Sequence, residues 1–588
     1  MANYIFIKTR QPTNSQEIID SLDNVCDLLT PTDIKSESQN SVETWERDKN
    51  AFYAIQNSEY VAKPEQNTLV IGWIDQPNSI ALKKIGTDAN GSYAVIQNDK
   101  NITTFFSDQF GSRTLWYFYD DDRLIVSTSQ RAIVALKRKF NLNEEAIAWY
   151  LSSGCQGPFI SWDQDIKQVL PDTQYILNDN DWQLNLQQKA NMSLPPSGIT
   201  KLSKYLKIYR KQVQQSLKQV VRDYPKGKVL LPLSGGLDSR LLLALSKEAG
   251  LLNRLTLVNW GVVSPKSKFD DKKAAHKVAK YYKKDLLNSY LPTQINNYDQ
   301  VLNHFVEAGE GRIDHFNAFT DDFEMWDDFF QSGYRTVIRG DIPYPTGVCI
   351  NQNQIRAKMG LELLSDYANV DKFSMQKYIK LQTENLTERL ESESLMRWRD
   401  RTFKDIRVPL VHSAFSQQIS AFMEIRSPMF SWSLYKLYMG LPDKKKGNKR
   451  HIHKLWKKYD KSGVSSKAIS SLCSLSSYFD GVEGQEYLVR KLENVLENET
   501  VDRELVESVY NKISISEKSQ NLIHSKRLLI MQKSKNILSE YMPTQIKAYL
   551  KSTRTKKLSA KTLAYRIVLI DKIIEMYQLD GKYIERNK

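Results

Sequence analysis

Hydrophobic and polar residues alternate in short segments through the first 190 residues, and Asn, Asp and Gly turns separate these segments. Alternation with a period of two is typical of half-buried β-strands. The pattern therefore predicts a β-rich amino-terminal region that contains only one or two helical stretches. The clearest predicted strands are 67–75, 91–99, 102–110, 114–120 and 123–129.

The pattern changes after a linker rich in Pro, Ser and Gly at 193–201. Hydrophobic residues now recur at helical spacing, and continuous apolar segments between the helices are typical of buried parallel strands. Strands that alternate with helices in this way predict βαβ units around a parallel sheet. The predicted helices are 199–222, 240–249 and 270–284, and the predicted strands are 229–233, 254–260 and 335–340.

From about residue 466 the chain is mostly charged and helical in pattern, with 486–496 and 525–538 as the clearest helices. A length of 588 residues leaves room for about three or four domains. We therefore predict an α/β multidomain protein with one domain at 1–192, a second at 199–465 and a helical extension at 466–588.

Composition narrows the class of protein. A hydrophobic share of 41% is enough for sizeable cores and excludes global disorder. The four cysteines are far apart in sequence, which argues against a disulfide framework or a cysteine zinc site and favours a reducing, cytoplasmic compartment. No signal-peptide core and no apolar run of about 18 residues is present, so we expect no membrane span. The cysteines are Cys26, Cys155, Cys349 and Cys473.

The net charge of +15 comes mainly from two segments. Residues 443–458 hold eight Lys or Arg against one Asp, and residues 541–588 hold eleven Lys or Arg against four acids. Such a balance suits nucleic-acid binding, but for the second segment a solvated helix face is the favoured explanation.

The segment L-P-L-S-G-G-L-D-S-R at 231–240 carries the strongest chemical signal. A buried strand leads into two glycines and then a helix, which directs free backbone N–H groups and the positive helix end to one place. Such a nest binds phosphate. The hydroxyls of Ser234 and Ser239 add donors, and Asp238 can hold Mg²⁺. Because no Walker lysine is present, this is not the P-loop of kinases and GTPases.

The motif S-G-G-L-D-S resembles the SGGxDS signature of the ATP-pyrophosphatase (PP-loop) superfamily, whose members split ATP between the α and β phosphates. Residues 107–136 resemble a run in the amino-terminal-nucleophile glutaminase domain of asparagine synthetases, and 91–99 resemble the strand before that run. Residues 271–282 and 424–447 resemble two later blocks of the same family.

The resemblance covers roughly residues 1–465. It implies a class II glutaminase-like (Ntn) α+β sandwich at 1–192, a PP-loop parallel α/β synthetase domain at 199–465 and a carboxy-terminal helical extension.

The sequence also departs from the family. A glutaminase of this class needs Cys directly after the initiator Met, where the free α-amine serves the thiolate as a base. That position is Ala2, so we expect no glutamine hydrolysis, as in the β-lactam synthetases and lasso-peptide cyclases of the family. The loop after the third predicted strand is R-G-D-I-P-Y-P-T-G at 339–347 instead of S-G-x-G-x-D-E-x-F-G-G. Asp341 matches either of two family acids there, and Tyr344 is either an acid/base phenol or a packed tyrosine.

In the family, a lysine in the segment that 443–458 resembles stabilises the charge that develops when an amine attacks the acyl-adenylate. Lys449 fits this position by residue type and Arg450 by spacing, with Lys454 as a second cation. His451 and His453 lie at alternate positions of a predicted helix, so we expect packing or solvent roles for them.

These observations predict a ligase that uses ATP and Mg²⁺ to adenylate a carboxylate on a small molecule or peptide, and an amine then attacks. We expect a carrier or partner protein at the helical extension and no nucleic acid. A tRNA-modifying PP-loop enzyme and an inactive synthetase-like scaffold remain as alternatives. The predicted catalytic residues are Lys449, Arg450, Asp341 and Tyr344. The predicted ATP-binding residues are Leu233, Ser234, Gly235, Gly236, Leu237, Asp238, Ser239, Val258 and Gly340. The predicted metal ligands are Asp238 and Asp341.

Overall fold

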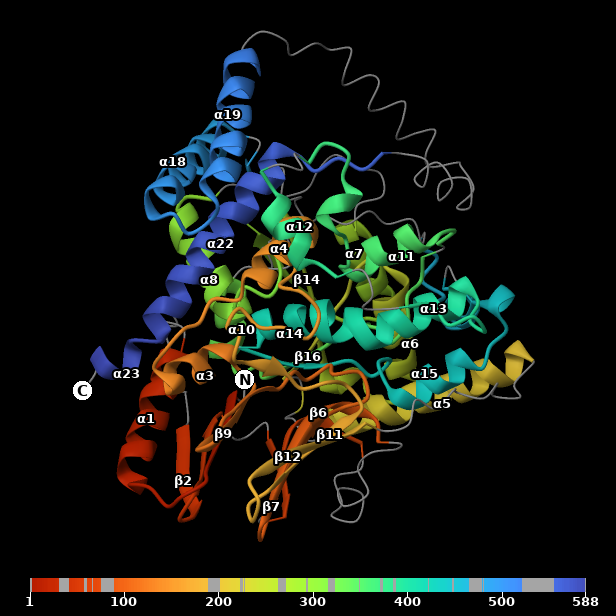
Figure 1. Ribbon diagram of the computed structural model, residues 1–588. Helices are drawn as coiled ribbons and strands as arrows, with labels where there is room; N and C mark the ends of the chain where they lie inside the picture. The colour runs from red at the N-terminus through yellow and green to blue at the C-terminus, as the bar shows by residue number, and fades with distance from the viewer. Residues whose placement is uncertain are drawn as a thin grey trace.

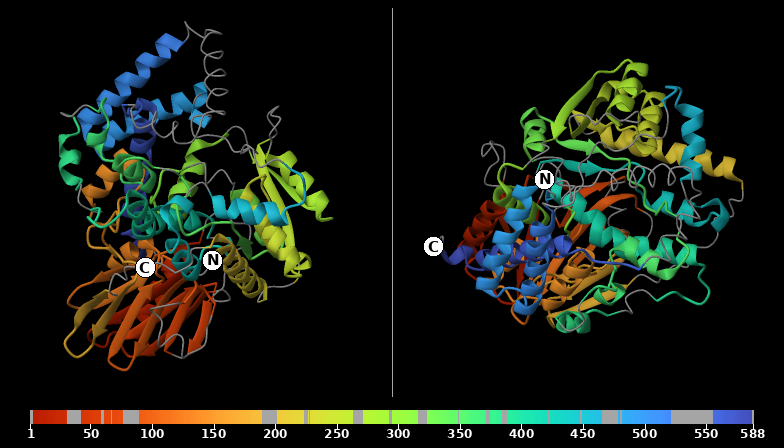
Figure 2. Two further views of the ribbon diagram at one scale, coloured as in Figure 1. Left: turned by 90° about the vertical axis from the view of Figure 1, so that its right-hand side faces the viewer. Right: turned by 90° about the horizontal axis from the view of Figure 1, so that it is seen from above.

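The structure is a computed structural model of the chain (Figure 1). Two stacked antiparallel sheets form one end of the molecule, a parallel sheet with its helices lies beside them, and a helical layer covers the opposite end (Figures 1 and 2). The structure describes residues 3–30, 42–57, 61–65, 67–75, 89–188, 201–222, 226, 228–262, 271–291, 295–315, 323–347, 349–370, 374–383, 388–420, 422–446, 449–464, 478–479, 481–520 and 555–586.

Each antiparallel sheet has six strands, in the orders β10-β8-β9-β1-β3-β2 and β12-β11-β7-β6-β5-β4. The two sheets pack through one hydrophobic cluster, to which the first contributes Tyr4 and Phe6 and the second contributes Ile96 and Phe105. The strands of the first sheet are β1 (Asn3–Thr9), β2 (Val42–Asp48), β3 (Ala51–Gln56), β8 (Trp116–Tyr119), β9 (Arg123–Ser127) and β10 (Lys167–Gln168). Those of the second are β4 (Val61–Glu65), β5 (Thr68–Ile74), β6 (Gly91–Asp99), β7 (Ile102–Ser107), β11 (Thr173–Asn178) and β12 (Gln183–Gln188).

The other face of the first sheet is covered by helices α1 (Ser15–Leu28), α3 (Gln130–Lys137) and α4 (Glu144–Ser153). Successive side chains of a strand point to opposite faces of its sheet. In β1, Tyr4 and Phe6 therefore pack between the sheets, whereas Ile5 and Ile7 pack against the helices.

A separate five-stranded sheet has the order β15-β14-β13-β16-β17, and every pairing in it is parallel. The chain starts in the middle at β13, adds two strands on one side, and then returns to add two on the other. Apolar residues of helices lie on both faces, as a buried parallel sheet requires. The strands are β13 (Val229–Pro232), β14 (Leu255–Val262), β15 (Leu286–Leu291), β16 (Thr336–Ile338) and β17 (Glu424–Arg426).

The helices around this sheet come from much of the middle of the chain. One group shares the cluster on the face of the sheet that holds Leu231, and α10 lies on the other face beside Leu230. The first group is α5 (Leu202–Arg222), α6 (Leu237–Glu248), α7 (Asp271–Tyr281), α15 (Trp432–Met439) and α16 (Arg450–Tyr459). The remaining elements of the region are α8 (Tyr298–Gly309), α10 (Phe323–Gln331), α11 (Gln352–Met359), α12 (Gln376–Leu381), α13 (Leu395–Thr402), the π-helix η6 (Phe403–His412), α14 (Ser413–Ile419) and the short 3₁₀ turns η3 (Leu252–Arg254), η4 (Leu364–Asp366) and η7 (Asp443–Lys445).

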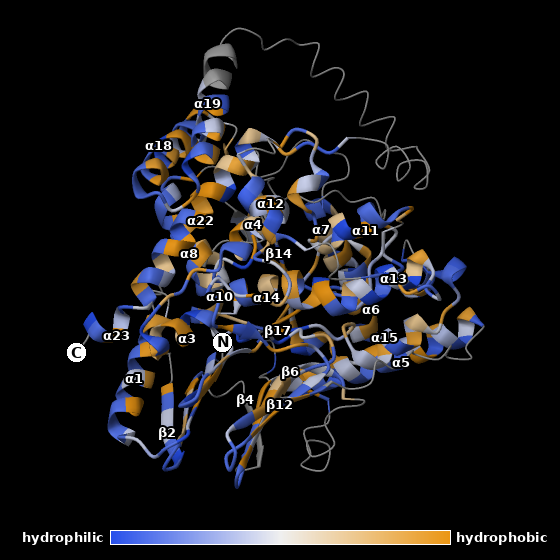
Figure 3. Ribbon diagram, in the orientation of Figure 1, coloured by the Kyte–Doolittle hydropathy of each residue, from blue (hydrophilic) through white to orange (hydrophobic). Residues whose placement is uncertain are grey.

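The late helices are α18 (Val482–Asn498), α19 (Arg503–Gln520), α22 (Ala560–Asp580) and α23 (Tyr583–Arg586). Helix α22 packs against α3, α4 and α8 on one side and against α18 and α19 on the other. Figure 3 shows hydrophobic residues where α3, α8 and α22 meet. Two buried ion pairs fix this helix: Arg131 with Asp580 at 2.8 Å and Arg566 with Asp314 at 2.7 Å. The described part of the predicted extension therefore shares a core with the amino-terminal region.

The mixed α/β class with a parallel sheet is confirmed, and all five strands predicted before residue 130 are present. The predicted helix at 525–538 lies outside the described residues, and the domain boundaries remain predictions. None of the described helices combines the length and hydrophobicity that a membrane crossing needs. The Ntn assignment of the two antiparallel sheets also remains a prediction.

Candidate functional site

The order of the parallel sheet defines where a ligand can approach. β14 and β16 lie on opposite sides of β13, so the chain leaves β13 in one direction and β16 in the other. Ligands of open α/β sheets bind outside the carboxyl ends of the strands at such a switch point. The segment Ser234–Ser239 follows β13 and Gly340 follows β16, so both lie at this position. We call Ser234–Ser239 the 234–239 turn.

The 234–239 turn is held open by its two serines. The Ser234 N–H donates to the Ser239 hydroxyl at 3.2 Å, and the Gly236 N–H donates to the Ser234 hydroxyl at 3.1 Å. The two hydroxyls also lie 3.0 Å apart. Helix α6 begins directly after Gly236, which has no side chain to cap it. The first N–H groups of a helix have no acceptor within the helix, so this end of α6 can receive an anion.

An anionic oxygen already lies on the turn. Asp271, the first residue of α7, accepts a hydrogen bond from the Gly235 N–H at 2.5 Å. The Gly235 N–H therefore points out of the turn and donates to a carboxylate from a neighbouring helix. The sequence analysis placed Asp271 at the start of a helix but gave it no role in the site, and its position 36 residues after Gly235 offered no local signal.

Asp238 and Lys449 meet at the mouth of the turn, where the Lys449 ammonium forms an ion pair with the Asp238 carboxylate. The other carboxylate oxygen of Asp238, Oδ1, is buried and has no hydrogen-bond partner among the described residues. Lys449 has φ of 51°, a left-handed conformation that costs a residue with a side chain of the order of 1–3 kcal/mol and is commonest at functional sites. The structure thus joins the predicted catalytic lysine to the predicted metal ligand.

Arg450, the other candidate cation, is the first residue of α16, and its side chain lies outside the described part of the structure. Lys454 lies one turn further along and is exposed. The choice between Lys449 and Arg450 therefore remains a prediction, and the ion pair with Asp238 favours Lys449.

Gly340 lies against the first turn of α6. A Cβ atom at this position would lie 2.8 Å from the Cβ of Asp238, closer than two carbon atoms can approach. The absence of a side chain at Gly340 thus lets the end of β16 pack against the 234–239 turn, and the predicted ATP-binding residue lies beside the motif.

Asp341 follows Gly340, but its carboxylate has other partners. It pairs with the Arg339 guanidinium at 3.2 Å and accepts from the Ser427 hydroxyl at 3.2 Å. With His412 it lines a small cavity of about 40 Å³ at the contact with the antiparallel sheets. Burial lowers the pKa of His412 to about 4, so this imidazole is neutral near pH 7. Asp341 therefore remains a predicted metal ligand without a described contact to Asp238.

Tyr344 is buried, with 2% of its surface exposed. Its ring stacks on that of Tyr438 with centroids 3.7 Å apart, and its hydroxyl lies 2.7 Å from Nε2 of His451. Burial lowers the pKa of His451 to about 3, so this ring is neutral. The arrangement favours the packed-tyrosine alternative and gives His451 the packing role that we expected.

The other predicted ATP-binding residues support the turn from within. Leu233 is buried, its N–H donates to the Val258 carbonyl at 2.8 Å, and its own carbonyl accepts from the Asn259 amide at 2.8 Å. Val258, in β14, has no exposed surface and packs with Leu230 on one face of the sheet. Leu237 is half-buried at the start of α6. Contact of these residues with ATP remains a prediction.

Sequence reasoning also missed Arg240. Its guanidinium donates to the Gly235 carbonyl at 2.8 Å and to Asp460 at 3.0 Å, and both side chains are almost fully buried. This bridge ties the end of α16 to the 234–239 turn. No local motif predicts it, because Asp460 lies 220 residues away.

Mg²⁺ fits this site through one protein carboxylate. Within the described residues, no three His, Cys, Asp or Glu side chains gather as a metal-binding group. Mg²⁺ commonly takes one or two carboxylates and completes its shell with phosphate oxygens and water. The unpaired Oδ1 of Asp238 is suited to this role.

Comparison with known proteins identifies no family for this chain. No family model matches the chain, and no curated protein matches its sequence. One similar structure is the NH3-dependent NAD synthetase from Campylobacter jejuni, with 17% identity over 24% of this chain and 58% of that one, and a TM-score of 0.18. Another is the U34-tRNA thiolase NcsA from Methanococcus maripaludis, with 15% identity over 55% of this chain and 82% of that one, and a TM-score of 0.21. The match thus spans little more than half of the NAD synthetase. TM-scores this low do not establish a common overall fold.

Proposed function

We propose that this protein is an ATP-dependent amide-bond-forming ligase. It adenylates a carboxylate, releases pyrophosphate, and lets an amine attack the acyl-adenylate so that AMP leaves. The observation that carries the proposal is the 234–239 turn, which directs N–H groups and a helix end to the switch point of a parallel sheet beside an aspartate and a lysine.

Each group has a role that follows from its position. The N–H groups of the turn and the hydroxyls of Ser234 and Ser239 hold phosphate oxygens. Asp238 would hold Mg²⁺, which supplies charge neutralisation to the phosphates when it is bound. Lys449 exchanges its pairing with Asp238 for the negative charge that develops as the amine attacks.

The amine is used directly in this proposal. Residue 2 is Ala, so the chain has no thiol at the position of the family nucleophile, and Ala2 itself lies outside the described residues. We further propose that the protein acts in the cytoplasm, that its substrates are a small molecule or a peptide, and that the helices after residue 466 dock a carrier or partner.

Hydroxylamine trapping tests the chemistry without knowledge of the natural amine. Purified protein with ATP, Mg²⁺, hydroxylamine and a panel of carboxylic acids should form a hydroxamate, AMP and pyrophosphate with at least one acid. Lys457→Ala, also at an exposed position of α16, is the matched control and should keep this activity. Formation of ADP and phosphate, or failure to bind ATP at all, would contradict the proposal. The second result would favour an inactive scaffold.

One observation keeps a tRNA-modifying enzyme as a second candidate. Helix α5 contains no acidic residue. Four exposed lysines that form no ion pair with a described residue follow its outer face at helical spacing: Lys204, Lys207, Lys211 and Lys218. Phosphate contacts by such a row would make RNA binding fall steeply with salt. RNA that copurifies at low salt, and is lost when these lysines are changed to Gln, would favour this candidate over the ligase.

A further inference from the structure

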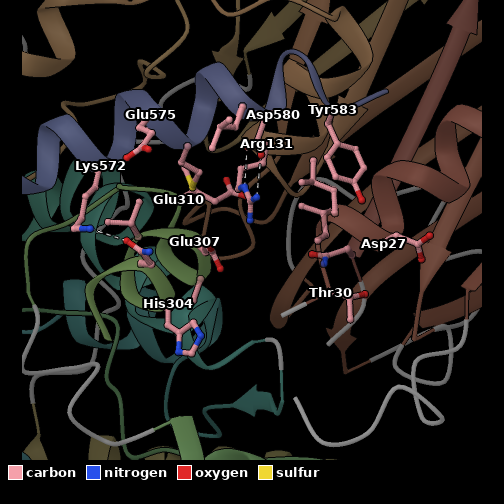
Figure 4. Close-up of a pocket in the computed structure, with 18 of the residues that line it drawn as sticks. Asp27, Thr30, Arg131, His304, Glu307, Glu310, Lys572, Glu575, Asp580 and Tyr583 are labelled. Carbon is pink, nitrogen blue, oxygen red and sulfur yellow. Dashed lines mark hydrogen bonds and ion pairs between the residues drawn. The ribbon is translucent and has the colours of Figure 1, made fainter. Parts of the chain in front are cut away.

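A cavity of about 460 Å³ lies where the amino-terminal region meets α22 (Figure 4). Lining residues come from α1, α3, α8, α14, α22 and α23, so segments from both ends of the chain form it. No residue of the 234–239 turn lines this cavity. It is therefore separate from the candidate ATP site.

The size of the cavity and the aliphatic part of its lining suit a small organic ligand. Typical ligand pockets have volumes of about 300–1,000 Å³ and a mainly apolar wall with a few polar groups. Here Leu28, Val306, Met576 and Leu579 supply aliphatic surface from α1, α8 and α22. An aliphatic chain of several methylene groups can pack against this surface.

The charged lining is predominantly acidic. Five carboxylates face three cations in the wall, and two of those cations already have partners. Arg131 holds Asp580 through two hydrogen bonds of 2.8 and 2.9 Å, and Lys572 pairs at 2.9 Å with Asp299, which is not part of the lining. The five carboxylates are Asp27, Glu307, Glu310, Glu575 and Asp580.

Glu310 is the most informative of these acids because only 3% of its surface is exposed. Its carboxylate accepts from the Ser129 hydroxyl and, at 2.9 Å, from the Gln130 N–H. Burial raises its pKa, while its hydrogen bonds and the nearby Arg131 cation oppose that shift; Glu310 forms no ion pair with a described residue. Glu307, Glu575 and Asp27 likewise form no ion pair with any described residue. A desolvated carboxylate is stabilised by a cation, so this lining favours a positively charged ligand.

We propose that this cavity binds an aliphatic polyamine. Carboxylates on α1, α8 and α22 stand on different sides of the cavity, which suits a ligand with ammonium groups at more than one point along its length. The methylene segments between those groups would pack against Val306 and Met576. This site goes beyond the proposed ligase activity, since binding needs neither ATP nor the 234–239 turn.

Calorimetric titration of the full chain with spermidine tests the proposal directly. We expect one saturable site per chain. Glu307→Gln together with Glu575→Gln should weaken binding about tenfold, because each change removes one partly screened attraction. Glu497→Gln, at an exposed acid of α18 outside the cavity, is the matched control and should leave the affinity unchanged.

Two further measurements separate a cavity site from general attraction to acids. Ala308→Phe keeps every charge but fills part of the cavity, so it should abolish spermidine binding. The neutral 1,8-octanediol should not bind. The proposal is overturned if spermidine does not saturate one site, if Glu497→Gln weakens binding as much as the cavity variants do, or if the diol binds equally well. Loss of ligase activity in an ATP-site variant would not affect these titrations.

Discussion

Lys449 and Asp238 are 211 residues apart in sequence, and their ion pair closes the mouth of the 234–239 turn. Each group neutralises the other while no ligand is present. In the function that we propose, a nucleotide would replace this pair with new contacts, which would free a cation for the reacting carboxyl group and a carboxylate for a metal ion.

Loss of the Lys449 cation should affect the second half-reaction most. Lys449→Ala is expected to leave carboxylate-dependent ATP–pyrophosphate exchange largely intact and to lower amide formation by about 100-fold or more. Arg450→Ala should mainly raise the ATP concentration required. If Lys449→Ala abolishes ATP–pyrophosphate exchange and Arg450→Ala abolishes amide formation instead, the two assignments are reversed.

Asp238→Asn removes the carboxylate but keeps the shape of the side chain. Turnover should fall by roughly 100- to 1,000-fold, because the leaving pyrophosphate loses the metal ion that neutralises it. The melting temperature should change little, since the residue is half-buried at the start of a helix. An unchanged turnover rate in Asp238→Asn would show that Asp238 has no role in the catalytic site.

Asp271 holds the Gly235 N–H that a phosphate would need in the proposed function. Asp271→Asn removes a negative charge from the turn, so ATP should bind several-fold more tightly when Kd is measured by fluorescence titration. Lys273→Ala, an exposed change on the same helix, serves as the control. Weaker binding in Asp271→Asn would mean that the aspartate helps to shape the turn.

The ion pair between Arg131 and Asp580 should contribute strongly to stability. Asp580→Asn leaves the almost fully buried guanidinium without its charge partner, which typically costs about 3–5 kcal/mol. Urea denaturation should show this loss. The double variant Arg131→Met with Asp580→Leu removes both charges and should recover much of it; no recovery would show that the loss arises from packing alone.

Acid should weaken the attachment of α22 through Asp299. Burial alone would raise the pKa of Asp299, but hydrogen bonds from Lys572 and Lys491 outweigh it and lower the pKa to about 2. The charged form is thus favoured in the folded state, so its contribution is present above pH 4 and is lost as the pH falls toward 2. The difference in urea midpoint between wild type and Asp299→Asn should shrink over that interval. A constant difference would contradict the assignment.

Local patterns were sufficient for the 234–239 turn and much of the parallel sheet. An apolar strand, two glycines and an amphipathic helix are adjacent in sequence, so their geometry follows from neighbouring residues. The three predicted parallel strands correspond to β13, β14 and β16. β15 and β17 were not predicted; β17 (Glu424–Arg426) has a charged residue on each side of Ile425, so no apolar run marks it.

Contacts between distant segments could not be predicted in this way. The position of Asp271 on Gly235 depends on how α7 returns to the sheet, and the burial of Tyr344 depends on His451, 107 residues later. The cavity beside α22 has the same origin, because its carboxylates come from helices near both ends of the sequence.

The placement of α22 has a consequence for biosynthesis. Ile567 and Ile570 of this helix share one hydrophobic cluster with Ile5 and Leu22, so during synthesis the region around β1 cannot complete its core until α22 has followed. At typical rates of elongation the nascent amino-terminal region waits for a time on the order of tens of seconds with that surface uncovered. Chaperones that shield apolar surface during translation would therefore raise the yield of folded protein.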